Sequence, residues 1–223
     1  MKTLLPLVTA LIAIVLTASS SLAQETSASP AAATAATAAT TAGAPNDAEM
    51  MKQMMELSKL GENHKILAGL AGTWSYTVKM WMNPDPSAKP EESKGTATRK
   101  PTMDGRFFVL DVTGKMEMPG PDGKKKEMIF KGMGIEGYDN VKKKFVSTWM
   151  DNMGTGVMMS EGSYDPASKT FTYTGDYEAI PGMKTQIRET VKVTDKDHHT
   201  FEMYENRSGK EVKTVEINYR RKK

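Results

Sequence analysis

Two stretches of the sequence repeat a pattern whose residue types could support acid–base chemistry. Residues 137–149, GYDNVKKKFVSTW, and residues 163–175, SYDPASKTFTYTG, share the pattern x-Tyr-Asp-x-x-x-Lys-x-Phe. Its carboxylates, Asp139 and Asp165, are of the kind that general acid–base catalysis uses. The same spacing is typical of a β-hairpin, because an aspartate bonds the backbone of its own turn and Tyr and Phe then form a cross-strand pair. We interpret the repeat as a repeated hairpin and expect no enzymatic activity.

The other residue types that support catalysis or metal binding are scarce. The chain has no cysteine, no Gly-x-Ser-x-Gly, no His-Glu-x-x-His and no phosphate-binding glycine loop. Of its three histidines, His64 precedes the first expected strand and suits a helix cap or the surface. His198 and His199 are adjacent, so on a strand they point to opposite faces and cannot chelate one ion together. The sequence predicts no cofactor and no metal site on these residues.

Methionine gives the one alternative that involves a metal. The chain has 18 methionines, and thioethers select Cu(I) in exported proteins. Three pairs stand close together in the sequence: Met80 with Met82, Met116 with Met118, and Met158 with Met159. A Met-x-Met pair on a strand puts both sulfurs on one face, which an apolar core also requires. A copper-handling protein is therefore an alternative to the binding function argued below.

The first residues predict export. Residues 1–23 combine a basic start at Lys2, an apolar run over 4–16 and the small-x-small site that ends at Ala23. The apolar run is shorter than the ~20 residues that a bilayer-spanning helix needs. We expect cleavage near Ala23, a periplasmic or secreted protein, and no transmembrane segment in the mature chain.

The next segments are a linker and a helix. Residues 24–45 are rich in Ala and Thr with almost no large apolar side chain, which predicts a disordered linker. Residues 46–61 then predict one helix, with Asn46 as its cap and a stripe of methionines that we expect to pack against the protein. The net charge of +3 is modest, and we expect no nucleic-acid partner.

From Gly72 onward the apolar residues recur with period two, which indicates strands with one apolar face. About ten strands are predicted, around residues 73–82, 95–100, 106–118, 127–138, 144–151, 156–164, 169–177, 184–193, 200–206 and 212–220. Polar turns join them, and residues 83–94 are expected to form a loop. Closing such a sheet on itself hides the apolar face and removes both edges. We predict a single up-and-down antiparallel β-barrel over 62–223, with a two-sheet sandwich as the alternative.

Several motifs resemble a bacterial family of secreted and cytoplasmic proteins that is classed as a domain of unknown function. They are Gly72 with Trp74, Gly105 with Arg106, Gly137-Tyr138-Asp139, and Trp149 with Asp151. The resemblance covers Glu62 to the end of the chain. It implies a barrel similar to lipocalins and to the haem-binding nitrobindins, and it brings no established reaction. No motif for haem is present.

A small barrel has room for one small ligand, so we predict that the interior binds an apolar or amphipathic molecule. The candidate inward residues are Trp74, Tyr76, Met80, Phe108, Leu110, Val112, Met159, Tyr173 and Ile217. Arg188 is the polar candidate, placed near the barrel mouth to meet a carboxylate, with a surface arginine as the alternative. A barrel filled by its own side chains, with a structural or interaction role, is the other possibility.

Overall fold

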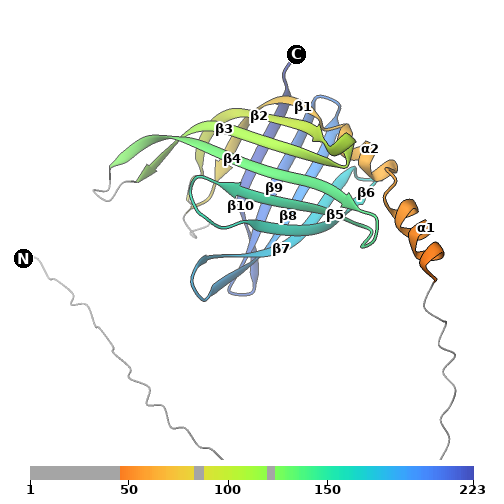
Figure 1. Ribbon diagram of the computed structural model, residues 1–223. Helices are drawn as coiled ribbons and strands as arrows, with labels where there is room; N and C mark the ends of the chain where they lie inside the picture. The colour runs from red at the N-terminus through yellow and green to blue at the C-terminus, as the bar shows by residue number, and fades with distance from the viewer. Residues whose placement is uncertain (1–45, 83–87, 120–123) are drawn as a thin grey trace, which may run out of the picture. The chain divides into compact units, whose positions relative to one another are not determined.

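The computed structural model describes residues 46–82, 88–119 and 124–223, and the expected signal peptide and linker lie outside them. The described chain forms two helices, ten strands and a short 3-10 turn (Figure 1). The helices are α1 (Asp47–Leu57) and α2 (Glu62–Ala68). The strands are β1 (Gly72–Met80), β2 (Glu91–Thr102), β3 (Phe107–Pro119), β4 (Lys125–Asp139), β5 (Lys144–Asp151), β6 (Met158–Asp165), β7 (Thr170–Ile180), β8 (Met183–Asp195), β9 (His198–Arg207) and β10 (Lys210–Arg221).

The ten strands close into one antiparallel barrel. Each strand pairs with the strands before and after it in sequence, and β1 also pairs with β10. The predicted up-and-down barrel is confirmed, and the sandwich alternative is wrong because the sheet has no open edge. Glu91 to Lys94 belong to β2 and pair with β1, so the loop expected over 83–94 is shorter than predicted. The β3–β4 hairpin extends beyond the barrel wall (Figure 1).

The repeated pattern forms two equivalent hairpin turns, as predicted. Asp139 Oδ1 accepts hydrogen bonds from the backbone N–H groups of Val141 (2.8 Å) and Lys142 (3.1 Å). Asp165 Oδ1 accepts the corresponding bond from the Ala167 N–H at 2.9 Å. The repeated lysines, Lys143 and Lys169, both have φ of 54°, in the left-handed region. Both aspartates therefore serve the turns.

The same repeat closes one end of the barrel with aromatic rings. Tyr138 pairs with Phe145 and Tyr164 with Phe171, with ring centroids 4.9 and 4.6 Å apart. Leu67 of α2 is buried against Phe145 and Phe171 in one cluster. The two hairpins and α2 thus form a plug, and we call this the closed end of the barrel.

The N-terminal segment differs from the prediction of a single helix over 46–61. Asn46 caps α1, as predicted, by accepting a hydrogen bond from the Glu49 N–H at 2.9 Å. Helix α1 ends at Leu57, and Gly61 is the N-cap of a second helix, α2. The Gly61 N–H donates a hydrogen bond to Nδ1 of His64 at 3.1 Å. His64 is therefore a cap, as one expectation had it, but it is buried and not on the surface.

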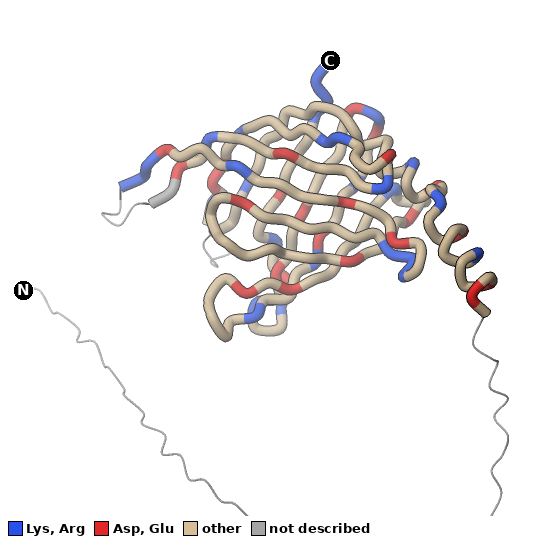
Figure 2. Tube along the Cα trace, in the orientation of Figure 1, with Lys and Arg blue, Asp and Glu red and all other residues tan. Residues whose placement is uncertain are grey.

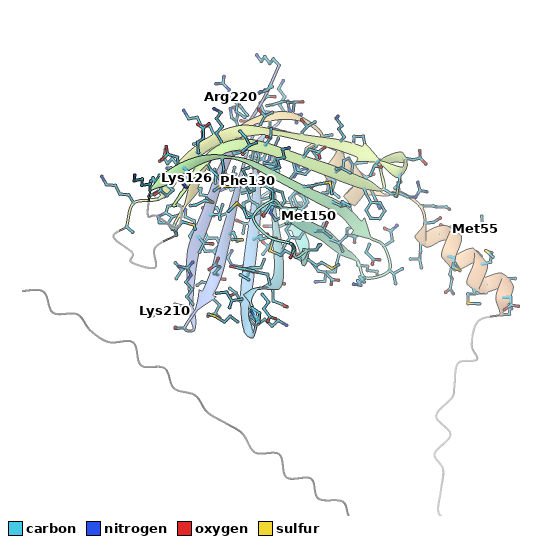
Figure 3. All side chains as sticks on the ribbon, turned by 60° about the vertical axis from the view of Figure 1, so that its left-hand side comes forward. Met55, Lys126, Phe130, Met150, Lys210 and Arg220 are labelled. Atoms are coloured by element: carbon cyan, nitrogen blue, oxygen red, sulfur yellow. The ribbon has the colours of Figure 1, made fainter. Side chains whose placement is uncertain are left out.

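The methionine stripe of α1 is exposed, so the expectation that it packs against the protein is wrong for the described residues. No residue of α1 is buried. In Figure 3 the helix and its labelled Met55 stand away from the barrel wall. The periodicity did mark an amphipathic helix, but periodicity alone does not say what covers the apolar face.

Trp74 connects the closed end to the seam of the barrel, by which we mean the pairing of the first strand, β1, with the last, β10. It is 1% exposed, and its Nε1 donates to the Leu70 carbonyl oxygen at 3.0 Å. The Arg221 guanidinium lies 4.1 Å from the ring centroid and donates to the carbonyl oxygens of Ala71 (2.5 Å) and Gly69 (2.9 Å). The first strand, the last strand and the end of α2 therefore meet at one indole.

We predict that Trp74→Ala lowers the free energy of unfolding by about 3–5 kcal/mol, the usual cost of losing a buried tryptophan. Thermal and urea unfolding followed by circular dichroism would measure it. Trp81→Ala is the matched control, because Trp81 is only half-buried, just after β1, and should lose less than half as much. Equal losses from the two variants would contradict the central role given to Trp74.

We also predict that Lys143→Gly and Lys169→Gly each stabilise the protein by about 0.5 kcal/mol. Glycine removes the side-chain clash of a left-handed residue, which costs ~1–2 kcal/mol, although it loses more entropy on folding. Lys144→Gly, one residue further along in β5, should instead destabilise the barrel. Urea unfolding compares the three variants. A loss of stability at both turn positions would contradict the predicted relief of strain, and a gain at one turn with a loss at the other would contradict the equivalence of the hairpins.

Candidate functional site

The barrel interior is shaped by aromatic rings that lie over glycines. A Cβ built on Gly95 or Gly114 would lie 2.3 or 2.4 Å from the Tyr76 hydroxyl oxygen, and one on Gly132 would lie 2.4 Å from the Trp149 ring. These positions must be glycine for the two rings to lie flat against the inner wall. Aromatic rings therefore line the β1–β5 side of the interior.

A set of polar side chains lies among these apolar clusters. We call it the interior polar cluster: Arg99 of β2, Glu136 of β4, Ser160 of β6, Tyr173 of β7 and Glu189 of β8. Arg99, Ser160, Tyr173 and Glu189 are all buried, and the Glu136 side chain is 12% exposed. Polar groups enclosed in this way carry a free-energy cost unless each finds a partner.

Arg99 and Glu136 form a buried ion pair that is only partly satisfied. Arg99 Nη2 donates to Glu136 Oε1 at 2.8 Å, across the intervening strand β3. Within the described part of the chain, Nε and Nη1 of Arg99 and Oε2 of Glu136 have no hydrogen-bond partner. Two donors and one acceptor therefore remain free in the interior.

Ser160 and Glu189 meet across β7. The Ser160 hydroxyl donates to Glu189 Oε2 at 2.9 Å, although β7 lies between their strands. The β7 residue that pairs with Ser160 is Gly175, and a Cβ there would come within 3.2 Å of the Ser160 Cβ. Ser147 of β5 is the other neighbour of Ser160. This part of the wall is therefore lined by small side chains.

Burial changes the pKa values of two members of the cluster, Glu189 and Tyr173. It raises the pKa of the Glu189 carboxyl; the Ser160 hydrogen bond opposes this rise and the charge of Glu136 adds to it. Burial also raises the pKa of Tyr173 strongly, and the charge of Glu136 raises it further. Both groups therefore favour their neutral forms, in which they can donate a hydrogen bond.

His199 borders the cluster toward the closed end. Its ring stacks on Tyr219, with centroids 4.4 Å apart, and meets Trp74 edge-on at 4.3 Å. Burial lowers its pKa to about 3, and the charges of Arg99 and Arg221 act in the same direction. Nδ1 of His199 also lacks a partner within the described residues. His198 is exposed on the other face, so the prediction that the two histidines point apart is confirmed.

Most of the predicted inward residues lie inside the barrel. The buried ones are Trp74, Tyr76, Phe108, Val112 and Tyr173, and the half-buried ones that pack against the core are Met80, Leu110 and Ile217. Met159 is the exception, because its side chain is 68% exposed on the outer wall. Two methionines stand side by side in β6, and the strand alternation turns the second one outward.

Arg188 also lies on the outer wall and not at the barrel mouth. Its Nε and Nη2 each donate to the Glu211 carboxylate at 2.7 Å, and its guanidinium lies 4.1 Å from the Tyr204 ring centroid. The alternative of a surface arginine is the correct one. Together with Met159 it lines a hollow of about 880 Å³ that extends from β3 to β10 and is also bordered by Ser160 and Gly175.

The methionine pairs do not gather at one place. Met80 and Met116 line a hollow of about 200 Å³ beside Glu91. This hollow lies at the end of the barrel opposite the closed end, where β1 finishes, and we call it the open end. The third pair belongs to β6, which is five strands away from β1 in either direction around the wall. In the described residues, no group of three or more His, Cys, Asp or Glu is arranged to hold a metal ion.

Charge on the outside of the barrel is mixed. Figure 2 shows Lys and Arg interspersed with Asp and Glu along the strands. Several of these form exposed ion pairs, such as Lys115 with Glu127 at 2.9 Å. Over the described ranges, none of the helices has the length and apolar character needed to cross a membrane.

Sequence reasoning missed the charged members of the interior polar cluster. Arg99 was on the strand predicted around residues 95–100, but neither it nor Glu136 and Glu189 were among the candidate residues. The available signal was strand phase: Arg99 follows Ala97 by two residues, and Glu189 lies between Ile187 and Val191, which are both buried. An ionisable residue in phase with apolar ones marks a buried charge.

Glu189→Gln is predicted to stabilise the protein at pH 8 and to have little effect at pH 4. The raised pKa means that the folded protein holds the Glu189 proton more tightly than the unfolded chain does. The stability that protonated Glu189 gives the wild type is therefore fully present below the unfolded pKa and is lost as pH rises through the folded pKa. Melting temperatures of both proteins across this range would test it. A difference that stays constant with pH would show that Glu189 is not enclosed as described.

Three comparisons place the chain among known proteins. Residues 59–221 match the family model described as "Protein of unknown function (DUF1579)". A search of the curated proteins found no match. Among solved structures, the chain is similar to a fluorescence-activating β-barrel that was designed de novo, with 13% identity, 70% of this chain and 96% of that chain covered, and a TM-score of 0.37. A TM-score this low carries no argument about function.

Proposed function

The chain belongs to the DUF1579 family of proteins of unknown function, as its motifs suggested, and we propose that it is an exported protein that binds a small amphipathic molecule inside its barrel. The predicted signal peptide supports export. On this proposal the protein is a binding protein and not an enzyme. The repeated aspartates support that, since their carboxylates accept hydrogen bonds within the turns.

The observation that carries the proposal is the unmet hydrogen-bonding capacity of a buried guanidinium. Arg99 is 5% exposed and keeps two nitrogen donors free. Buried polar atoms in folded proteins nearly always have a partner, in the protein, in ordered water or in a ligand. Aromatic and aliphatic side chains surround the interior polar cluster, and this mixture of apolar wall and a few polar groups is typical of small-molecule sites.

Native mass spectrometry tests the proposal directly. We expect protein purified from the periplasm without denaturation to carry a small organic molecule in stoichiometric amount, which solvent extraction then releases. The matched control is the same protein unfolded, washed and refolded, which should show only the mass of the polypeptide. A single polypeptide mass in both samples would favour the barrel filled by its own side chains.

A further inference from the structure

The Arg99 guanidinium is buried and cannot become neutral by losing its proton. A carboxyl such as Glu189 can take up a proton and become neutral when water is excluded. A guanidinium stays charged in proteins, so its free N–H groups must find acceptors or remain a cost. The only acceptor that Arg99 has in the described structure is Glu136 Oε1.

Two nitrogens of the Arg99 guanidinium, Nε and Nη1, have no acceptor among the described residues. The hydroxyls of Tyr173 and Tyr219 are close enough for Arg99 and Glu136 to alter their pKa values, and burial keeps both phenols protonated. Glu136 Oε2 is a buried acceptor that also lacks a partner in the described structure, and so does His199 Nδ1, which donates or accepts according to its tautomer. Because a guanidinium donates and cannot accept, a group that brings acceptor atoms complements Arg99 better than one that brings only donors.

The wall beside Glu136 is lined by small side chains. Glu136 pairs with Ser147, Ser147 with Ser160, and Ser160 with Gly175 along one row of the register. Trp149 and Phe130 lie on the same strands as Ser147 and Glu136, and pack with the core toward the open end. An amphipathic ligand would match this order if its polar head group lay beside the serines and its apolar tail beside the aromatic rings.

We infer that the ligand of the barrel is an amphipathic organic acid whose carboxylate accepts hydrogen bonds from the free N–H groups of Arg99. The inference rests on the proposed function and specifies its ligand class. Charge-assisted hydrogen bonds from arginine to a carboxylate are among the strongest in proteins. The head group would share the guanidinium with Glu136, while the tail points away from the plug of the closed end.

The test is a series of probes with one tail and three heads: decanoate, decan-1-ol and decylamine. Isothermal titration of the refolded full chain should give decanoate a dissociation constant at least tenfold lower than those of the alcohol and the amine. The double variant Arg99→Gln with Glu136→Gln removes both charges together, so that neither is left buried alone, and should abolish the preference for decanoate. Circular dichroism would confirm that this variant folds.

Arg188→Gln is the matched control, because Arg188 also pairs with a glutamate but lies on the outer wall. It should bind decanoate as the wild type does. If Arg188→Gln loses the binding while the double variant keeps it, the acid occupies the outer hollow and the inference is wrong. Equal affinity for acid and alcohol, or tighter binding of the amine, also overturns it, and these comparisons need only the wild type.

The two levels of the proposal fail in different ways. If the native protein carries a neutral or cationic molecule, the binding function stands and the acid is excluded. If the native protein is empty and none of the three probes binds, the proposed function falls and the inference falls with it.

Discussion

The contact of Trp74 with Arg221 and His199 is the interaction on which the rest of the barrel depends. An up-and-down sheet removes its edges only where its first and last strands pair, and Trp74 of β1 stands opposite Arg221 of β10 at that seam. Arg221 and the Trp74 indole also bond the backbone carbonyls of the residues that directly follow α2. The seam and the closed end are therefore stabilised by the same few atoms.

The packing at the closed end and along one side of the wall limits where an interior site can lie. The plug of α2 and the repeated hairpins fills the closed end with apolar side chains, and Tyr76 and Trp149 cover the glycines on one side of the wall. What remains near the middle is the row of small residues beside Glu136 and Glu189. The polar groups gather there because backbone positions without a large side chain let bonds cross a strand, as the Ser160–Glu189 bond does over Gly175.

The sequence predicted the architecture and the apolar interior well and the polar residues of the site poorly, for one physical reason. Strand alternation and turn residues are local signals, so the ten strands, the two equivalent hairpins and the cap at Asn46 could be predicted from short segments. Which residue faces inward depends on the phase of each strand, and one wrong phase moves a side chain through the wall. Met159 was assigned to the interior and Arg188 to the barrel mouth, while their neighbours Ser160 and Glu189 are the residues that lie inside. The prediction that the methionine stripe of α1 packs against the protein was wrong for a similar reason, because no local pattern indicates what packs on a helix.

Stability alone does not account for the Arg99–Glu136 pair. Replacing a buried ion pair with apolar side chains of similar volume is often neutral or stabilising, because removing two charges from water costs about as much as their attraction returns. This pair is less favourable than most, since two nitrogens and one oxygen lack partners in the described structure. A ligand that supplies acceptors to Arg99 would convert those unmet groups into binding free energy. The same atoms that weaken the empty barrel would then provide both affinity and head-group specificity in the occupied one.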